Sequence, residues 1–347
     1  MSINQKYILV TGGAGFIGSH TVVELIAAGY SPIVLDDFRN SERFISKKLE
    51  KLTNQKITFV DAACQDLNVL EDLFNQYSFE GVIHFAADKA VGESVQNPLK
   101  YYDNNISSLI AILKMIDKFQ TKSLVFSSSC TVYGNPLETT GKSEVTEDSV
   151  FLQPDSPYGN TKLICEQILK DWSFSNSVSK VVLLRYFNPI GAHPSGEIGE
   201  LPQGIPNNLL PFITQTAVGI REQLTIFGND YDTVDGTCIR DYIHVCDLAD
   251  AHVSAINWLK TQTTAGIEIF NIGTGKGTSV LEMVQAFEKI SNKSLNWKYG
   301  SKRSGDIPEI FANPSKAKKM LQWESKYTIY QAIEDAWRWE TNRLQHV

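Results

Sequence analysis

The sequence predicts a doubly wound α/β fold, in which helices cover both faces of a parallel sheet and a smaller mixed α/β lobe follows. Through the first half of the chain, short apolar runs rich in β-branched residues alternate with longer amphipathic segments. The runs are apolar at consecutive positions, which is typical of strands buried on both faces and joined by right-handed crossovers. This alternation stops near residue 186, so a second structural unit is expected to begin there.

The strands expected in the sheet are residues 7–10, 33–35, 57–60, 82–85, 124–126 and 181–184. Apolar residues at helical spacing mark the segments between them, most clearly 21–28, 99–118 and 158–174. Together these units predict one sheet domain over residues 1–186.

A different composition marks the second lobe, expected over residues 187–347. It begins with the segment 188–211, which is rich in Gly, Pro and Asn and predicts a long ordered loop bordering a site. The strands and helices expected beyond it are, in chain order, 224–227, 242–245, 280–291 and 328–344. Near 247–273 the chain is expected to return to the first sheet, through the segments 247–260 and 268–272.

The composition excludes several classes of protein. With 347 residues, 42% hydrophobic and 20% charged, the chain is typical of a compact globule rather than a disordered one. The net charge is −7 and no basic run occurs, so no nucleic-acid partner is expected. No apolar stretch approaches the roughly 18 residues of a membrane span, and no signal-peptide core is seen, so no membrane partner is expected.

Cysteine and histidine spacings give a second set of exclusions. The five cysteines form no Cys-x-x-Cys pair, and the six histidines show no His-x-x-His spacing. Neither a disulfide framework nor a metal site is therefore expected. Reduced thiols are typical of a cytoplasmic protein, which is the predicted location.

The first expected strand leads directly into a glycine-rich turn. Gly12, Gly15 and Gly18 follow it at the spacing Gly-x-x-Gly-x-x-Gly, before the helical pattern at 21–28. A diphosphate needs main-chain amides at a helix N-terminus with no Cβ in the way, and the third glycine lets helix and strand approach closely. The glycines alone also fit a turn in an ordinary βα unit. Their place between a strand and a helix favours a Rossmann-type dinucleotide site.

An acidic residue at the end of the second expected strand indicates which dinucleotide binds. Asp36 follows 18 residues after Gly18. A carboxylate there would accept hydrogen bonds from both ribose hydroxyls of an adenosine half, and it would repel a 2′-phosphate. The sequence therefore predicts NAD rather than NADP as the cofactor.

A second motif follows the fifth expected strand. Ser127, Ser128 and Ser129 end that strand, and Tyr158 and Lys162 lie four residues apart on one helix face. A phenol titrates near pKa ~10, but a nearby ammonium and a cationic nicotinamide favour the phenolate and are expected to lower the pKa of Tyr158. Tyr158 could then take a proton from a substrate hydroxyl. Alone, the Tyr-x-x-x-Lys pattern also fits a solvated helix; with the glycines and serines it indicates a redox site.

These motifs together resemble the extended short-chain dehydrogenase/reductase superfamily and, within it, the family of UDP-glucose 4-epimerases. Beyond the superfamily motifs, three long stretches carry the likeness, at residues 84–94, 186–192 and 235–245. The resemblance implies a reversible, NAD-dependent inversion at C4 of UDP-galactose and UDP-glucose through a 4-keto intermediate. It also implies an NAD-binding domain over 1–186, a nucleotide-sugar lobe over 187–347, and a homodimer built from two helices of the first domain.

The resemblance also assigns site residues. Tyr158 is the implied catalytic base, Lys162 its partner on the nicotinamide ribose, and Ser129 the partner of the reacting sugar hydroxyl. The residues implied for NAD are Gly12, Gly15, Phe16, Ile17, Gly18, Asp36, Asn40, Ser41, Cys64, Phe85, Ala86, Ala87, Lys89, Asn104, Ser127, Tyr158, Lys162 and Phe187. Those implied for the nucleotide sugar are Lys89, Ser129, Asn188, Asn208, Leu209, Leu224, Thr225, Ile226, Phe227, Arg240, Tyr242, Arg303, Asp306 and Ile310. Arg240 and Arg303 also fit on chemical grounds, because a diphosphate needs cations, although each alone would more often be a surface ion pair.

Two positions depart from the family pattern. Where most relatives have an aspartate for the adenine amino group, this chain has Ala63, and main-chain contacts, Asp61 or Asp66 are the alternatives. Ile310 matches the position that, in this family, gates the pocket beside the sugar's 2-substituent. Narrow members carry a bulky aromatic residue there and broad members a small one. The branched side chain of Ile310 predicts a preference for unacetylated sugars, although such a steric mismatch discriminates by only about 1–3 kcal/mol.

Three alternative functions stay open. One is an epimerase acting mainly on UDP-N-acetylglucosamine, which Ile310 disfavours. Another is a nucleotide-sugar 4,6-dehydratase, which would need an acidic pair where this chain has Cys130 and Thr131. The last is a catalytically silent NAD-binding sensor, which need not keep both Tyr158 and Lys162.

Overall fold

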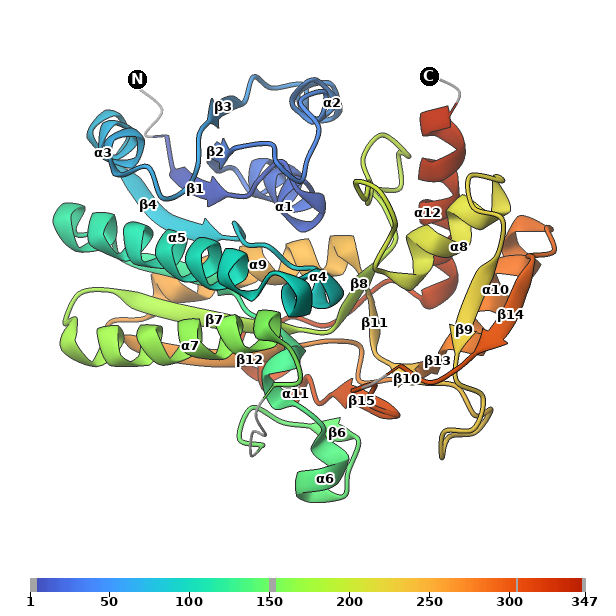
Figure 1. Ribbon diagram of the computed structural model, residues 1–347. Helices are drawn as coiled ribbons and strands as arrows, with labels where there is room; N and C mark the ends of the chain where they lie inside the picture. Colours follow the sequence, from blue (N-terminus) through green and yellow to red (C-terminus); the bar gives the residue numbers. More distant parts are fainter. Residues whose placement is uncertain (1–4, 150–153, 304, 345–347) are drawn as a thin grey trace.

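The computed structural model describes residues 5–149, 154–303 and 305–344, and a seven-stranded parallel sheet lies at its centre (Figure 1). The strands of this sheet are β1 (Tyr7–Thr11), β2 (Ser31–Asp36), β3 (Thr58–Asp61), β4 (Phe79–His84), β5 (Ser123–Ser127), β7 (Lys180–Tyr186) and β12 (Gly266–Ile272). Their spatial order is β12-β7-β5-β4-β1-β2-β3. The order reverses between β1 and β4, which is where doubly wound sheets form their ligand crevice.

Helices cover both faces of the sheet. One layer holds α1 (Phe16–Ala27), α2 (Ile45–Thr53), α9 (Val245–Thr261) and α11 (Ser315–Met320); the other holds α3 (Leu67–Gln76), α5 (Pro98–Phe119) and α7 (Pro157–Ser175). Along β1, Ile8 and Val10 belong to the first layer and Leu9 to the second, because successive side chains of a strand point to opposite faces. Burial on both faces explains why the inner strands are largely apolar, and the predicted doubly wound α/β fold is confirmed.

Short elements connect the sheet to a second lobe. The short elements of the first half are α4 (Val91–Gln96), the 3₁₀ turn η1 (Cys130–Tyr133), α6 (Pro136–Thr140) and β6 (Glu144–Val145). The second lobe contains β8 (Asn188–Ile190), α8 (Leu209–Ala217), β9 (Leu224–Phe227), β10 (Ile239–Arg240), β11 (Tyr242–His244), β13 (Thr278–Ser279), α10 (Val280–Ser291), β14 (Trp297–Gly300), β15 (Glu309–Ala312) and α12 (Ile329–Leu344). Figure 1 shows α8, α10 and α12 gathered on the right, where they share one hydrophobic core, apart from the large sheet.

The small sheets join segments that are distant in the sequence. β10 pairs with β13 and β15, and β15 pairs with β6 of the first half. β11 pairs with β8, and β14 with β9. The segments expected to return to the first sheet are α9, which covers one face, and β12, which pairs with β7 along its whole length. The domain boundary at residue 186 stays a prediction.

Some element bounds differ from those expected. α1 begins at Phe16, five residues before the expected start, because the glycine turn leads straight into the helix. The segment 188–211, expected as a loop, contains β8 and the first turn of α8. Among the described helices none is long and apolar enough to cross a membrane. All five cysteines are free thiols, and the described residues contain no cluster of three or more metal-ligating side chains.

Candidate active site

A cavity opens at the carboxyl ends of the parallel strands. Its lining comes from the loops that follow β1, β2, β3 and β4 and from the ends of β5 and β7. Because the carboxyl ends of parallel strands meet at one edge of a sheet, residues far apart in sequence converge here. Residues 199–203, 205, 207 and 208 of the second lobe also line it, so the segment 188–211 does border a site, as expected.

The glycine turn is shaped by contacts that a side chain would prevent. Gly12 has φ +69°, and a Cβ at this position would lie 2.8 Å from the Ala86 nitrogen. A Cβ on Gly18 would lie 2.3 Å from the Gly12 oxygen. Gly15 caps α1 without a side-chain hydrogen bond, so the amides of the first turn are available to an anion. The turn therefore offers the Cβ-free cradle that a diphosphate requires.

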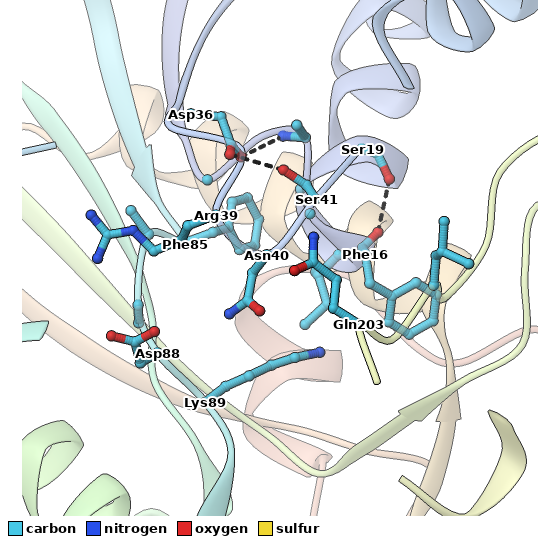
Figure 2. Close-up of a pocket in the computed structure, with 18 of the residues that line it drawn as sticks. Phe16, Ser19, Asp36, Arg39, Asn40, Ser41, Phe85, Asp88, Lys89 and Gln203 are labelled. Atoms are coloured by element: carbon cyan, nitrogen blue, oxygen red, sulfur yellow. Dashed lines mark hydrogen bonds between the residues drawn. The ribbon is translucent and has the colours of Figure 1, made fainter. Parts of the chain in front are cut away.

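Asp36 is held firmly beside this turn. Its Oδ1 accepts hydrogen bonds from Ser41 Oγ at 3.0 Å (Figure 2) and from the Phe38 nitrogen at 2.9 Å, and its Oδ2 accepts from the Ala14 nitrogen at 2.9 Å. Burial raises the pKa of Asp36, and these hydrogen bonds lower it. A carboxylate offers about four acceptor sites, so an ordered acceptor position is left for a ribose hydroxyl.

The residues predicted for NAD gather in this cavity. With the exception of Phe187, every residue named above for the cofactor lines it. Lys89 extends across the opening towards Gln203, and its Nζ lies 6.0 Å from the centroid of the Phe16 ring (Figure 2). Phe187 is instead buried in a small cluster with Ile310. The glycine cradle, the Asp36 carboxylate and these lining residues fit a dinucleotide.

Tyr158 and Lys162 lie at the same cavity on the first turns of α7. Both side chains are buried, with 6% and 3% exposed. Lys162 Nζ donates a hydrogen bond to the Ser127 main-chain oxygen at 2.7 Å and lies 4.8 Å from the centroid of the Phe126 ring. Burial lowers the pKa of Lys162 to about 8. The helix thus brings a lysine of unusually low pKa to the end of the serine strand.

The expected lowering of the Tyr158 pKa by the lysine is wrong for this protein. Burial raises the pKa of Tyr158 well above its ordinary value, the neighbouring Tyr186 raises it further, and a hydrogen bond with Ser129 lowers it. Desolvation prevails because Lys162 directs its ammonium to the Ser127 carbonyl. The contribution expected from a cationic nicotinamide stays a prediction.

Most residues predicted for the nucleotide sugar lie outside this cavity, in the second lobe. Lys89 and Asn208 line it; those outside it are Ser129, Asn188, Leu209, Leu224, Thr225, Ile226, Phe227, Arg240, Tyr242, Arg303, Asp306 and Ile310. Three of them form a charged group, in which Arg303 donates two hydrogen bonds to Asp306, at 2.9 and 3.0 Å, and Arg240 Nη2 lies 3.9 Å from Asp306. The Arg303 guanidinium also lies 4.9 Å from the centroid of the Phe227 ring.

The small sheets align further residues of this set. Asn188 pairs with Tyr242 between β8 and β11, and Arg240 pairs with Ile310 between β10 and β15. Ile310 is buried and packs with Phe187, next to the 3₁₀ turn that follows Ser129. The position expected to gate the sugar therefore lies between the serine strand and the arginines.

Several cavity residues were not predicted. They include Arg39, Gln65, Tyr186, Glu200, Gln203 and Trp339. Glu200 connects the two lobes, since its Oε1 accepts from Asn208 Nδ2 at 2.6 Å and lies 3.5 Å from Lys89 Nζ. Glu200 and Gln203 belong to the segment 188–211, whose composition pointed to a site without indicating these residues. Gln65 carries no sequence signal, because only the folded chain brings it to the cavity. Tyr186 begins the stretch 186–192 that carries the family likeness, but no role at the site was predicted for it.

The chain is similar to known proteins along nearly its whole length. The family described as "GDP-mannose 4,6 dehydratase" matches residues 9–336. Two curated proteins named "UDP-glucose 4-epimerase" are 50% identical over 337 residues (Bacillus subtilis; 97% of each chain) and 48% identical over 339 residues (Homo sapiens; 96% of each chain). A crystal structure of the Bifidobacterium longum "UDP-glucose 4-epimerase", in complex with NAD+ and UDP, is 42% identical, with a TM-score of 0.93 and coverage of 99% of this chain and 100% of that one.

Proposed function

The chain belongs to the family of UDP-glucose 4-epimerases, and from this premise we propose that it interconverts UDP-galactose and UDP-glucose by NAD-dependent inversion at C4. Apart from family membership, one observation supports this activity. Tyr158 and Lys162 line the same cavity as the glycine turn and Asp36. A group that can move a proton therefore stands beside the residues that fit a dinucleotide. The cofactor has the same oxidation state at the start and at the end of the reaction.

The cofactor would be held by three features of the chain. The amides after Gly15 would take the diphosphate, Asp36 the adenosine ribose, and Lys162 the nicotinamide ribose. When bound, NAD supplies the oxidation of C4 and its later reduction. The chain itself orients the two partners and handles the proton.

We assign the proton transfer to Tyr158. Its oxygen would take the proton of the sugar's 4-hydroxyl and return it at the end of the reaction. Ser129, whose interaction with Tyr158 lowers the pKa of the phenol, would bind the same hydroxyl and orient it. Because burial raises the pKa of Tyr158, the positive charge needed to form the phenolate must come from the loaded site, including Lys162.

The second lobe would grip the UDP part of the substrate. Arg240 and Arg303 supply charge for a diphosphate, and Asp306 orients both guanidinium groups. A firm hold on UDP with few contacts to the hexose would let the 4-keto sugar turn over, so that its opposite face meets the cofactor. Inversion at C4 requires this rotation.

Purified protein provides the test. It should retain NAD, detected in the supernatant after acid denaturation, and it should convert UDP-galactose to UDP-glucose in an assay coupled to UDP-glucose dehydrogenase. Tyr158→Phe should fold and keep NAD but lose about 10²- to 10⁴-fold in turnover. Tyr330→Phe, an exposed tyrosine on α12, is the matched control and should be unchanged. Absence of both NAD and conversion in the wild type would refute the proposal.

The side chains at three places in the chain disfavour the three alternative functions, which are an N-acetylhexosamine epimerase, a 4,6-dehydratase and a silent NAD sensor. Ile310 is fully packed against Phe187, so an N-acetyl group beside it would need space that the branched side chain occupies. Cys130 and Thr131 follow the serine strand and cannot supply the acid of a dehydratase, and burial raises the pKa of Cys130 to about 12. A silent sensor would not need Tyr158 and Lys162 at the cavity.

We further propose a homodimer formed through the outer surface of α5 and α7. Large apolar side chains are exposed there and on the adjoining α4, including Val95, Leu99 (81% exposed) and Phe174 (97% exposed). Light scattering should give twice the chain mass, and Leu99→Glu should reduce it to the monomer mass. An unchanged monomer mass for the wild type would contradict the dimer.

We also propose a cytoplasmic location, which the five unpaired cysteines support. Cell fractionation with an antibody to the chain tests it, and recovery in a membrane or secreted fraction would contradict it.

A further inference from the structure

The far end of the cavity, beyond Asp36, is formed by the loop that follows β3. β2 and β3 run side by side, with Asp36 paired to Asp61, so the loop after β3 lies next to the ribose-binding carboxylate. This loop contributes Ala62, Cys64 and Gln65 to the cavity lining. In a dinucleotide whose ribose is bound at Asp36 and whose diphosphate lies at the glycine turn, the adenine base extends into this end.

The two carboxylates that flank the loop after β3 are engaged in other interactions. Asp61 forms an ion pair with Arg43 on the surface, and Asp66 caps α3 by accepting from the main-chain nitrogens of residues 68 and 69. Neither lines the cavity, and Ala63 has no side-chain acceptor. The two acidic alternatives considered for the adenine amino group are thus engaged in other interactions.

Gln65 offers an acceptor whose orientation is fixed. Its Nε2 donates to Asn104 Oδ1 at 2.6 Å and to the Asn104 main-chain oxygen at 3.3 Å. A main-chain oxygen can only accept, so the nitrogen of the Gln65 amide must face it. The other amide atom, Oε1, makes no hydrogen bond with any residue that the structure describes. Arg39 Nη1 also donates to Asn104 Oδ1, at 3.2 Å, which steadies the asparagine.

We propose that Gln65, positioned by Asn104, accepts a hydrogen bond from the exocyclic amino group of the adenine; the inference rests on the proposed binding of NAD. Glutamine and asparagine amides are well suited to adenine, because they present an acceptor to its N6 amino group. The fixed orientation makes the contact selective. A base with a carbonyl oxygen at this position would face Oε1 acceptor to acceptor, and Gln65 could turn only by giving up both bonds to Asn104.

Competition between two dinucleotides tests this assignment without measuring catalysis. Holoprotein is incubated with an equimolar excess of NAD and nicotinamide hypoxanthine dinucleotide, which carries a carbonyl oxygen in place of the amino group. Incubation continues until the bound ratio is constant. The protein is then desalted and denatured, and the released dinucleotides are quantified by chromatography. Wild-type protein should hold NAD over the analogue by about tenfold or more, the value of one matched hydrogen bond.

Variants separate Gln65 from the rest of the site. Gln65→Leu should reduce the bound ratio to within about twofold of unity, because neither base then meets an acceptor. Gln76→Leu, the same substitution at a residue of α3 outside the cavity, should keep the wild-type ratio. Equal binding of both dinucleotides by the wild type, or an unchanged ratio in Gln65→Leu, would overturn the assignment of Gln65. Failure of the wild type to bind either dinucleotide would instead refute the proposed function.

Discussion

A buried ion pair ties helix α7 to the sheet, and its removal should be among the most costly single changes in the chain. Arg185 of β7 and Glu166 of α7 are both fully buried, with Nη2 to Oε2 at 2.6 Å and Nε to Oε1 at 2.9 Å. Ser128 Oγ donates to the same carboxylate at 2.6 Å. Glu166 follows Lys162 by one helical turn, so the pair fixes the helix that carries Tyr158 against the serine strand.

Removing one partner leaves an uncompensated charge in the core. Arg185→Met should lower the free energy of unfolding by about 3–5 kcal/mol, because the Glu166 carboxylate stays buried without its cation. The double variant Arg185→Met/Glu166→Leu removes both charges and should regain at least about 2 kcal/mol of that loss. Lys118→Met, which breaks the exposed pair with Glu71, should cost no more than about 1 kcal/mol.

Urea unfolding monitored by far-UV circular dichroism measures these differences. All variants are compared at one fixed excess of NAD, since ligand binding itself stabilises the folded state. A double variant no more stable than Arg185→Met would refute the reasoning, because the loss would then come from packing or hydrogen bonds rather than from the isolated charge.

Two further predictions concern the site. Ile310→Gly should raise the kcat/KM for UDP-N-acetylgalactosamine relative to UDP-galactose by about tenfold, because it removes a buried side chain at the expected sugar gate; an unchanged ratio would show that Ile310 is not the gate. The folded-state pKa of Lys162 is lowered from 10.5 to about 8, so the cost of burying its charge is fully present below pH 8 and is relieved as the pH rises to 10.5. Lys162→Met should therefore remove a rise in stability that the wild type shows between pH 8 and 10.5 in urea unfolding; equal pH profiles would contradict the shift.

The sequence was most informative where burial or backbone geometry leaves few choices. The strands of the main sheet were predicted because burial on both faces makes them continuously apolar, as in β5 and β7. The two-residue strands β6, β10 and β13 were not, because two residues carry no periodicity. The start of α1 was placed too late, since its first turn is defined by the glycines and not by an apolar stripe.

Some residues of the site could be predicted from local sequence motifs, and others could not. Residues fixed by local motifs, such as Gly12, Asp36 and Lys162, were predicted and line one cavity. Gln65 and Glu200 reach it only through the packing of distant segments, so no local pattern marks them. The direction of the Tyr158 pKa was wrong because the sequence shows a neighbouring lysine but not the burial that opposes it.

The central claim is inversion at C4 with the hydrogen of that carbon retained by the bound cofactor. Proton NMR of UDP-galactose turnover in D₂O tests it most directly. We predict UDP-glucose with protium at C4, since protons bound to oxygen exchange with solvent and the hydrogen carried by the cofactor does not. Deuterium at C4, or a product that has lost water, would contradict the account.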